Sequence, residues 1–437
     1  MHSMKLEDVP QHVVDRATLT LLDCFAVMVS GSTENRVQRM AEDLRARYGE
    51  CGKSSFVTDG LPGRPGDAAL LNATSMCLHV EDEGHRLAFG HIATYVLPAV
   101  LAVAQDTGAS GREFLSAFIA GYEVTARLGM AFKVKPDVHP TGTFGPVGGA
   151  AAVARLMGFD AERINETMNI AAPLTLATLW RASSEGATVR DLYSGWGNTL
   201  SVMAPTWQTV GFTACTDSVA EVLAHHTGTS FDAAIAVADF GQRWELLGNY
   251  FKLHACCGIF VTCLEEAMAM QRTHGFAASD VEEVTILTFQ TAASRSTNAE
   301  PTSPLAAKES LPVSLALAFI HGVVDRGTYN DENVFHPQTR ALAARVTVIG
   351  SDDYEQRLPE RRCFDITVRL KDGKTVKGAT EGRIDAPQDD ADVIRKYFTA
   401  VEPALGVAGA ARLKSAIENL TDAPNLEELA TILATRI

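Results

Sequence analysis

Apolar residues in the first half of the chain recur with the spacing of buried and amphipathic helices. From Pro10 to Ser30 they occupy most positions, which predicts a helix buried on most sides, and Gly31 follows where that helix should stop. Further helices are expected over residues 35–48, 67–78, 93–107, 111–132, 150–157 and 198–211. The polar stretch 183–197 is expected to be a loop. Hardly any segment before residue 250 alternates as a strand would, so this half should be all-helical.

The pattern changes after residue 250. Val281–Phe289, Arg345–Ile349 and Phe364–Leu370 alternate and are rich in β-branched residues, as strands are, and the last should turn at 371–374 into a hairpin. Helices are expected at 253–274, 308–323 and 390–397, with a helical tail at 405–437. The predicted fold is mainly α with an α+β second domain. A large helical domain should comprise residues 1–252, completed by 403–437, and a smaller α+β lid domain residues 253–402.

A glycine-rich segment lies in the middle of the helical half. Residues 139–142, His-Pro-Thr-Gly, form a turn, and Gly145, Gly148 and Gly149 then lead into the Ala-rich helix expected at 150–157. Glycines in a first helical turn cost stability, so something should offset them. Close packing against another helix is one explanation. The other is a helix N-terminus that binds an anion.

Composition and charge narrow the class of protein. The length of 437 residues is enough for two domains, and the formal net charge of −15 argues against nucleic acid as a partner, although not against a small anionic substrate. No apolar run is long enough to cross a bilayer, and the N-terminus lacks the apolar core of a signal peptide. These features indicate a cytoplasmic protein without a membrane partner. The eight cysteines show no Cys-x-x-Cys spacing, so a zinc site is not expected.

An acidic, histidine-rich loop is expected between two apolar helices. It contains His79, Glu81, Asp82, Glu83, His85 and His91. No helix-spaced pair of histidines supports metal binding there, so a metal is not expected. Asp82 can orient a histidine, or it can belong to a solvated acidic loop.

Two basic residues outside that loop are candidates for chemistry. Lys252 lies between apolar neighbours, where burial would lower its pKa and make it a base. The alternative is a lysine whose stem is buried and whose amine reaches water. The guanidinium of Arg190 can bind a carboxylate through two parallel hydrogen bonds. An ion pair with Asp191 or Glu185 is the alternative.

Several short motifs follow one another along nearly the whole chain. They are residues 22–26 (Leu-Asp-Cys-Phe-Ala), 68–72 (Ala-Ala-Leu-Leu-Asn), His91 with 96–99 (Val-Leu-Pro-Ala), 109–115 (Ala-Ser-Gly-Arg-Glu-Phe-Leu), 121–124 (Gly-Tyr-Glu-Val), 139–143 (His-Pro-Thr-Gly-Thr), Lys252 with Cys256-Cys257, and 308–312 (Lys-Glu-Ser-Leu-Pro). In this order and spacing the chain resembles the MmgE/PrpD family, which includes 2-methylcitrate dehydratase, cis-aconitate decarboxylase and iminodisuccinate epimerase. The resemblance implies a helical domain and an α+β lid with the active site between them. It also implies a homodimer, no metal and no organic cofactor.

The reaction that the resemblance implies is removal of the proton α to a carboxylate in a small polycarboxylate. It places two histidines and a lysine at catalytic positions and an aspartate in the acidic loop. Apart from the resemblance, Tyr193, which is close to Arg190 in sequence, could serve as a weak acid. The expected catalytic residues are His91, His139, Tyr193 and Lys252, and the expected substrate-binding residues are Asp82, His85, Thr141 and Arg190.

The sequence also departs from the family's dehydratase and decarboxylase members. Residues 82–85 are Asp-Glu-Gly-His where those members carry Asp-Asp-Thr-His, and residues 256–261 are Cys-Cys-Gly-Ile-Phe-Val where they carry Cys-Cys-Arg-Tyr-Thr-His. Arg190 stands in place of a lysine. These departures favour an epimerase, similar to iminodisuccinate epimerase, that transfers a proton to and from one carbon. A dehydratase or decarboxylase of a citrate-like acid is the alternative, and a catalytically silent binding protein is a further one.

Overall fold

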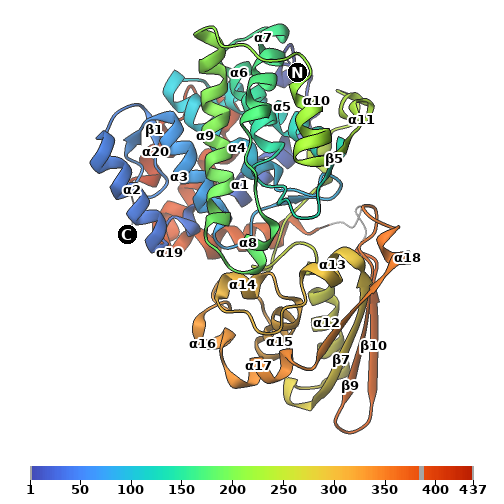
Figure 1. Ribbon diagram of the computed structural model, residues 1–437. Helices are drawn as coiled ribbons and strands as arrows, with labels where there is room; N and C mark the ends of the chain where they lie inside the picture. Colours follow the sequence, from blue (N-terminus) through green and yellow to red (C-terminus); the bar gives the residue numbers. More distant parts are fainter. Residues whose placement is uncertain (1, 383–387, 436–437) are drawn as a thin grey trace.

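The computed structural model describes residues 2–382 and 388–435. It consists of a large helical part and, below it in the view, a smaller part that contains a sheet (Figure 1). The predicted fold class, mainly α with an α+β second domain, is confirmed. Within the described ranges, no helix combines the length and the hydrophobicity that crossing a bilayer requires.

The helical part is built around α1 (Gln11–Gly31), which is buried on nearly all sides. It packs against α3 (Pro65–Cys77) and against α19 (Asp390–Glu418), which comes from the end of the chain. The sequence explains this position, because the apolar residues of α1 leave no continuous polar face for water. Gly31 ends the helix where an added Cβ would lie 1.9 Å from the carbonyl oxygen of Ser75.

Other helices surround this centre. They are α2 (Asn35–Tyr48), α4 (Ile92–Thr107), α5 (Gly111–Ala131), α6 (Gly145–Leu156), α7 (Ala161–Ala171), α8 (Trp180–Ser184), α9 (Val189–Thr209), α10 (Ser218–Glu221), α11 (Ala233–Val237) and α20 (Glu427–Leu433). Short strand pairs join the loops: β1 (Ser54–Ser55) with β2 (Pro62–Gly63), β3 (Gly84–His85) with β6 (Asn249–Tyr250), and β4 (Phe132–Val134) with β5 (Gly228–Phe231). The pair β3–β6 ties the acidic loop to the residues just before Lys252.

The glycines of α6 serve close helix packing, the first of the two explanations considered. A Cβ on Gly148 would lie 1.9 Å from the Thr125 hydroxyl of α5, and one on Gly149 would lie 2.4 Å from the Ser201 hydroxyl of α9. The helix begins at Gly145, earlier than expected, with its N-terminal turn buried. No side chain larger than hydrogen fits at these contacts, which lets α6 cross its neighbours closely.

The sheet-containing part has its own apolar core, separate from that of the helical part. Its sheet has the strand order β10-β9-β7-β8, in which β7 pairs parallel with β8 and antiparallel with β9. The strands are β7 (Val281–Phe289), β8 (Val346–Ser351), β9 (Phe364–Leu370) and β10 (Thr375–Thr380), and the helices are α12 (Val261–His274), α13 (Gln290–Arg295), α14 (Pro304–Lys308), α15 (Leu311–His321), α16 (Asp331–Val334), α17 (Pro337–Ala343) and α18 (Asp352–Glu355). Helix α12 packs on β10 and on α15, beside the sheet (Figure 1).

Two expectations about elements were wrong. The stretch 183–197 is not a loop, because α9 already starts at Val189. The helix expected from Leu253 begins only at Val261, and residues 253–260 are irregular. Both corrections matter for function, since α9 carries Arg190 and the irregular segment follows Lys252.

Candidate active site

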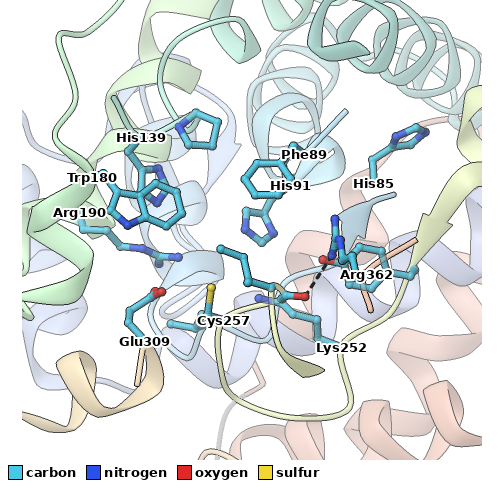
Figure 2. A pocket seen from close by; sticks show the side chains of 16 residues that line it. His85, Phe89, His91, His139, Trp180, Arg190, Lys252, Cys257, Glu309 and Arg362 are labelled. Carbon is cyan, nitrogen blue, oxygen red and sulfur yellow. Dashed lines mark hydrogen bonds between the residues drawn. The ribbon is translucent and has the colours of Figure 1, made fainter. Parts of the chain in front are cut away.

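A pocket lies where the acidic loop, α9 and the irregular segment after β6 meet (Figure 2). It is a cavity of about 60 Å³. Its lining comes from both parts of the molecule: Val80, His85, Phe89, Gly90, His91, His139, Pro140, Trp180, Arg190, Tyr250, Lys252, Cys257, Gly258, Ile259, Glu309 and Arg362. Several basic side chains therefore converge on one small space.

A buried carboxylate, Asp82, connects two of the pocket residues. Its Oδ1 lies 3.6 Å from Nζ of Lys252, and its Oδ2 lies 3.3 Å from Nδ1 of His91. Asp82 and Lys252 are both fully buried. Burial alone would raise the pKa of Asp82, but the surrounding His91, Lys252 and Arg190 outweigh it and lower the pKa to about 2. Asp82 is therefore ionised at neutral pH.

The state of Lys252 differs from the sequence-based expectation. Burial does favour the neutral amine, but the Asp82 carboxylate outweighs burial, so the pKa of Lys252 lies above its usual value. The expectation that burial would lower this pKa was wrong, because it took no account of a buried acid 3.6 Å away. Lys252 is a charged ammonium with no hydrogen-bond partner among the described residues. In this state it is an acid, not a base.

The hydrogen bonds of His91 determine its tautomer. Its Nδ1 lies 2.7 Å from the carbonyl oxygen of Glu83, and a carbonyl only accepts, so Nδ1 carries the proton. Burial lowers the pKa of His91 to about 4, in spite of the attraction of Asp82. The ring is therefore neutral near pH 7, and its Nε2 has a free lone pair. In this state the ring can accept a proton at Nε2.

His139 has the opposite tautomer. Its Nδ1 accepts a hydrogen bond from the backbone N–H of Thr141 at 3.2 Å, so the proton of the neutral ring is on Nε2. Burial, followed by the charge of Arg190, lowers the pKa of His139 well below its usual value. The ring stacks on Trp180 with centroids 5.1 Å apart. His139 is a fixed hydrogen-bond donor in the pocket wall.

Arg190 is buried at the other end of the pocket from Arg362 (Figure 2). Its Nη1 donates to the carbonyl oxygen of Cys77 at 2.8 Å and lies 3.6 Å from Asp191. Its Nε has no hydrogen-bond partner among the residues described. The ion pair considered as an alternative is present, and the guanidinium still faces the pocket.

Three cations from distant parts of the chain hold the acidic loop in place. Lys308 of α14 donates to the carbonyl oxygen of His79 at 3.1 Å, and Lys396 of α19 donates to that of Glu81 at 2.7 Å. Arg326 pairs with the Glu81 carboxylate at 2.7 Å. The position of Asp82, next in sequence, thus depends on contacts with the sheet-containing part and with the end of the chain.

Comparison with known proteins decides the family. Residues 1–222 match the MmgE/PrpD N-terminal domain, and residues 254–422 match the MmgE/PrpD C-terminal domain. The chain belongs to the MmgE/PrpD family. A cis-aconitate decarboxylase of Aspergillus terreus is 22% identical over 98% of this chain and 93% of its own. A cis-aconitate decarboxylase-like protein of Aspergillus oryzae, oryM, is 23% identical over 99% and 95%. A human cis-aconitate decarboxylase is 26% identical over 42% of this chain and 40% of its own.

Four of the residues expected in the site of this MmgE/PrpD protein line the pocket with side chains suited to chemistry: His91, His139, Arg190 and Lys252. Asp82 does not line the pocket and lies behind it, in contact with His91 and Lys252. Among the described residues, no group of three or more His, Cys, Asp or Glu side chains is arranged to hold a metal ion.

The structure gives the other expected residues supporting positions. His85 lines the pocket, but its Nε2 contacts the carbonyl oxygen of Glu245 and its Nδ1 accepts from the N–H of Ala88, which leaves no nitrogen for substrate. The Thr141 hydroxyl bonds to Tyr95 at 2.8 Å. The hydroxyl of Tyr193 accepts from the N–H of Leu179 at 3.2 Å, outside the pocket.

Tyr250 is a pocket residue that sequence analysis missed, although its signal was present. The family departures at residues 84 and 258 both replace a larger side chain with glycine. A Cβ on Gly84 would lie 2.6 Å from the Tyr250 ring, and one on Gly258 would lie 2.3 Å from its hydroxyl. The two glycines are therefore explained by one tyrosine. Trp180, Glu309 and Arg362 were missed as well. Glu309 lies within the motif 308–312, whereas no spacing or motif points to Trp180 or Arg362.

Proposed function

We propose that this MmgE/PrpD protein is a cofactor-independent acid/base enzyme that removes the proton α to a carboxylate of a small polycarboxylate. The proposal rests on one observation: a single carboxylate contacts both a side chain that can accept a proton and a side chain that can donate one. Asp82 contacts both His91, a neutral ring with a free Nε2, and Lys252, a charged ammonium. The pocket therefore holds a base and an acid at the same time, and the positive charge of Arg190 favours an anionic substrate there.

The reaction can be written from these residues. Nε2 of His91 takes the α-proton, and the electron pair of the C–H bond moves into the adjacent carboxylate as an enediolate. The charges of Lys252 and Arg190 stabilise that intermediate, and the Nε2–H of His139 can donate to a substrate oxygen. In an epimerase, Lys252 then returns a proton to the same carbon from the opposite face. The new C–H bond leaves a neutral amine and an imidazolium, and the reverse reaction exchanges their roles.

An epimerase of the iminodisuccinate epimerase type is our leading proposal. It is supported by the departures from the dehydratase and decarboxylase pattern, among them the glycines at positions 84 and 258. A decarboxylase or dehydratase of a citrate-like acid is the second candidate, and the 22% identity with cis-aconitate decarboxylase over nearly the full chain favours it. In a decarboxylase, the bond to CO₂ breaks first and Lys252 protonates the carbon that held it.

Proton NMR in D₂O separates the two candidates. Purified enzyme is incubated with iminodisuccinate, malate, citrate and cis-aconitate, and a His91→Gln variant is the control. Loss of an α-proton signal without a new vinyl resonance and without CO₂ supports the epimerase. A new vinyl resonance or release of CO₂ establishes a lyase. Silence across the panel contradicts the enzyme proposal and favours a binding protein.

We propose further that the protein is a homodimer that uses α9. Along this helix the apolar side chains of Val189, Leu192 and Trp196 are exposed, and Val210 and Phe212 follow just beyond its end. Trp196 is 48% exposed on a helix whose other face is buried, and Val210, just beyond the end of that helix, is 68% exposed. Exposed apolar stripes of this kind mark interaction surfaces. A twofold axis across α9 would cover the stripe with its own copy.

A further inference from the structure

Arg362 enters the pocket from the sheet-containing part. It lies between α18 and β9, far in sequence from every residue proposed for proton transfer. Figure 2 shows it on the side of the pocket opposite Arg190, with His91 and Lys252 between them. Arg362, Tyr250 and Gly258 also line a larger outer groove that adjoins the pocket. Arg362 therefore stands at the threshold between the pocket and the outside.

Within the described residues, no carboxylate compensates the charge of Arg362. Nη1 donates to the carbonyl oxygen of Gly258 at 3.1 Å, and Nη2 lies 3.5 Å from that of Arg86. The guanidinium carbon lies 5.5 Å from the Phe89 ring centroid and 5.7 Å from that of Tyr250. Among residues 2–382 and 388–435 no carboxylate pairs with it, whereas the neighbouring Arg361 pairs with Glu381. A guanidinium is always charged, so a half-buried one without an acid is suited to an incoming anion.

Tyr250 brings a second donor to the same place. Its ring is seated against Gly84 and Gly258, where any added side chain would displace it. Its hydroxyl makes no hydrogen bond to a described residue. The Tyr250 hydroxyl and the Arg362 guanidinium thus form a pair of hydrogen-bond donors, here called the threshold site. The Tyr250 ring packs directly against Gly84 and Gly258.

We propose that the threshold site, Arg362 and Tyr250, binds the second carboxylate of the substrate while Arg190 holds the first. The inference rests on the proposed function for its substrate class. It adds that the part of the substrate that reacts is a short diacid unit, such as one succinyl half of iminodisuccinate, with its reacting carbon between the two arginines. The cavity of about 60 Å³ holds on the order of four water molecules, which is comparable to a four-carbon diacid.

The outer groove sets a limit on the length of this diacid. Five acidic side chains line it, namely Glu265, Glu266, Glu381, Asp389 and Asp392, against two arginines. A carboxylate that reached past Arg362 would meet this acidic surface. The threshold site therefore selects acids in which the second carboxylate of this diacid unit ends at Arg362.

Calorimetric binding of succinate and of its monoamide, succinamate, tests the proposal without any turnover. The wild-type enzyme should bind succinate about 10- to 100-fold more tightly than succinamate, the range expected for one charge-assisted hydrogen-bond pair. Arg362→Met, which keeps the apolar stem, should remove this preference, and Tyr250→Phe should reduce it. Arg362→Lys should restore part of it. Arg361→Met, one position away and paired outside the pocket, should leave it unchanged.

The outcomes separate this inference from the proposed function. A wild-type enzyme that binds the two ligands equally overturns the threshold site, and so does an Arg362→Met variant with its preference intact. If the preference depends on Arg362 but no acid loses its α-proton in D₂O, the threshold site stands and the proposed reaction fails. If α-protons exchange and Arg362→Met leaves KM for the diacid unchanged, the reaction stands and the threshold site fails.

Discussion

Replacing Asp82 with asparagine should move the whole pH profile of the enzyme to lower pH. Asparagine keeps the shape of the side chain and removes its charge. Nζ of Lys252 lies 3.6 Å from the carboxylate, and at an effective dielectric constant of about 20 the lost attraction is on the order of 4–5 kcal/mol, or about 3 pH units. The apparent pKa of the basic limb of the pH profile, where Lys252 loses its proton, should fall by up to that amount. The apparent pKa of the acidic limb, where His91 titrates, should fall too, because the same carboxylate charge stabilises the His91 imidazolium.

The assay is kcat/KM for α-proton exchange between pH 4 and 10, with thermal unfolding measured in parallel. Breaking a buried ion pair costs roughly 3–5 kcal/mol, although Lys252 can reduce that cost by losing its proton. Glu123→Gln is a matched control, because Glu123 is a buried acid that pairs with Arg127 at 3.5 Å and does not line the pocket. It should lose stability and keep the wild-type limbs. A folded Asp82→Asn enzyme that keeps the wild-type apparent pKa of the basic limb would refute the assignment of Lys252 as the protonated acid of the site.

Four further predictions follow from the structure. In the wild-type enzyme, kcat/KM should rise with pH through an apparent pKa near 4 and stay flat through 6.5, because the base form of His91 exists above its lowered pKa; a limb at 6.5 would contradict its burial. His91→Gln should reduce kcat by about 10²- to 10⁴-fold in single-turnover measurements while the protein stays folded by circular dichroism. Gly148→Val should unfold at a clearly lower denaturant concentration than wild type, since its Cβ would overlap the Thr125 hydroxyl. Trp196→Glu should convert a dimer into a monomer in light scattering without a change in the fold.

Hydrophobic periodicity predicted the elements where one face of the chain is buried. The helix at Asn35–Tyr48 and the strands at Val281–Phe289 and Phe364–Leu370 have the bounds that the pattern indicated. It failed where polar residues are buried or glycines mediate contact. The start of α9 was mistaken for a loop because Arg190 is buried together with its neighbouring aspartate, a pattern that looks solvated in sequence.

The sequence predicted those residues of the candidate site that belong to the family motifs. His91, His139 and Lys252 were found through the family resemblance, and the family itself is confirmed by the domain matches. The protonation states could not be predicted, because they depend on distances to Asp82 that only the fold determines. Arg362 could not be found at all, because an arginine before a strand carries no signal until the strand is placed against another part of the chain.

The position of α19 against α1 has a consequence for the making of this protein. About 360 residues separate the end of α1 from the start of α19, so a ribosome adding roughly 5–20 residues per second needs on the order of 20–70 seconds to deliver the partner helix. During that time the part of the apolar surface of α1 that α19 will cover faces water or other chains. Lys396, which holds the acidic loop, arrives equally late. The newly made chain therefore passes through a stage at which most of its helices exist and the contacts that complete its candidate site do not.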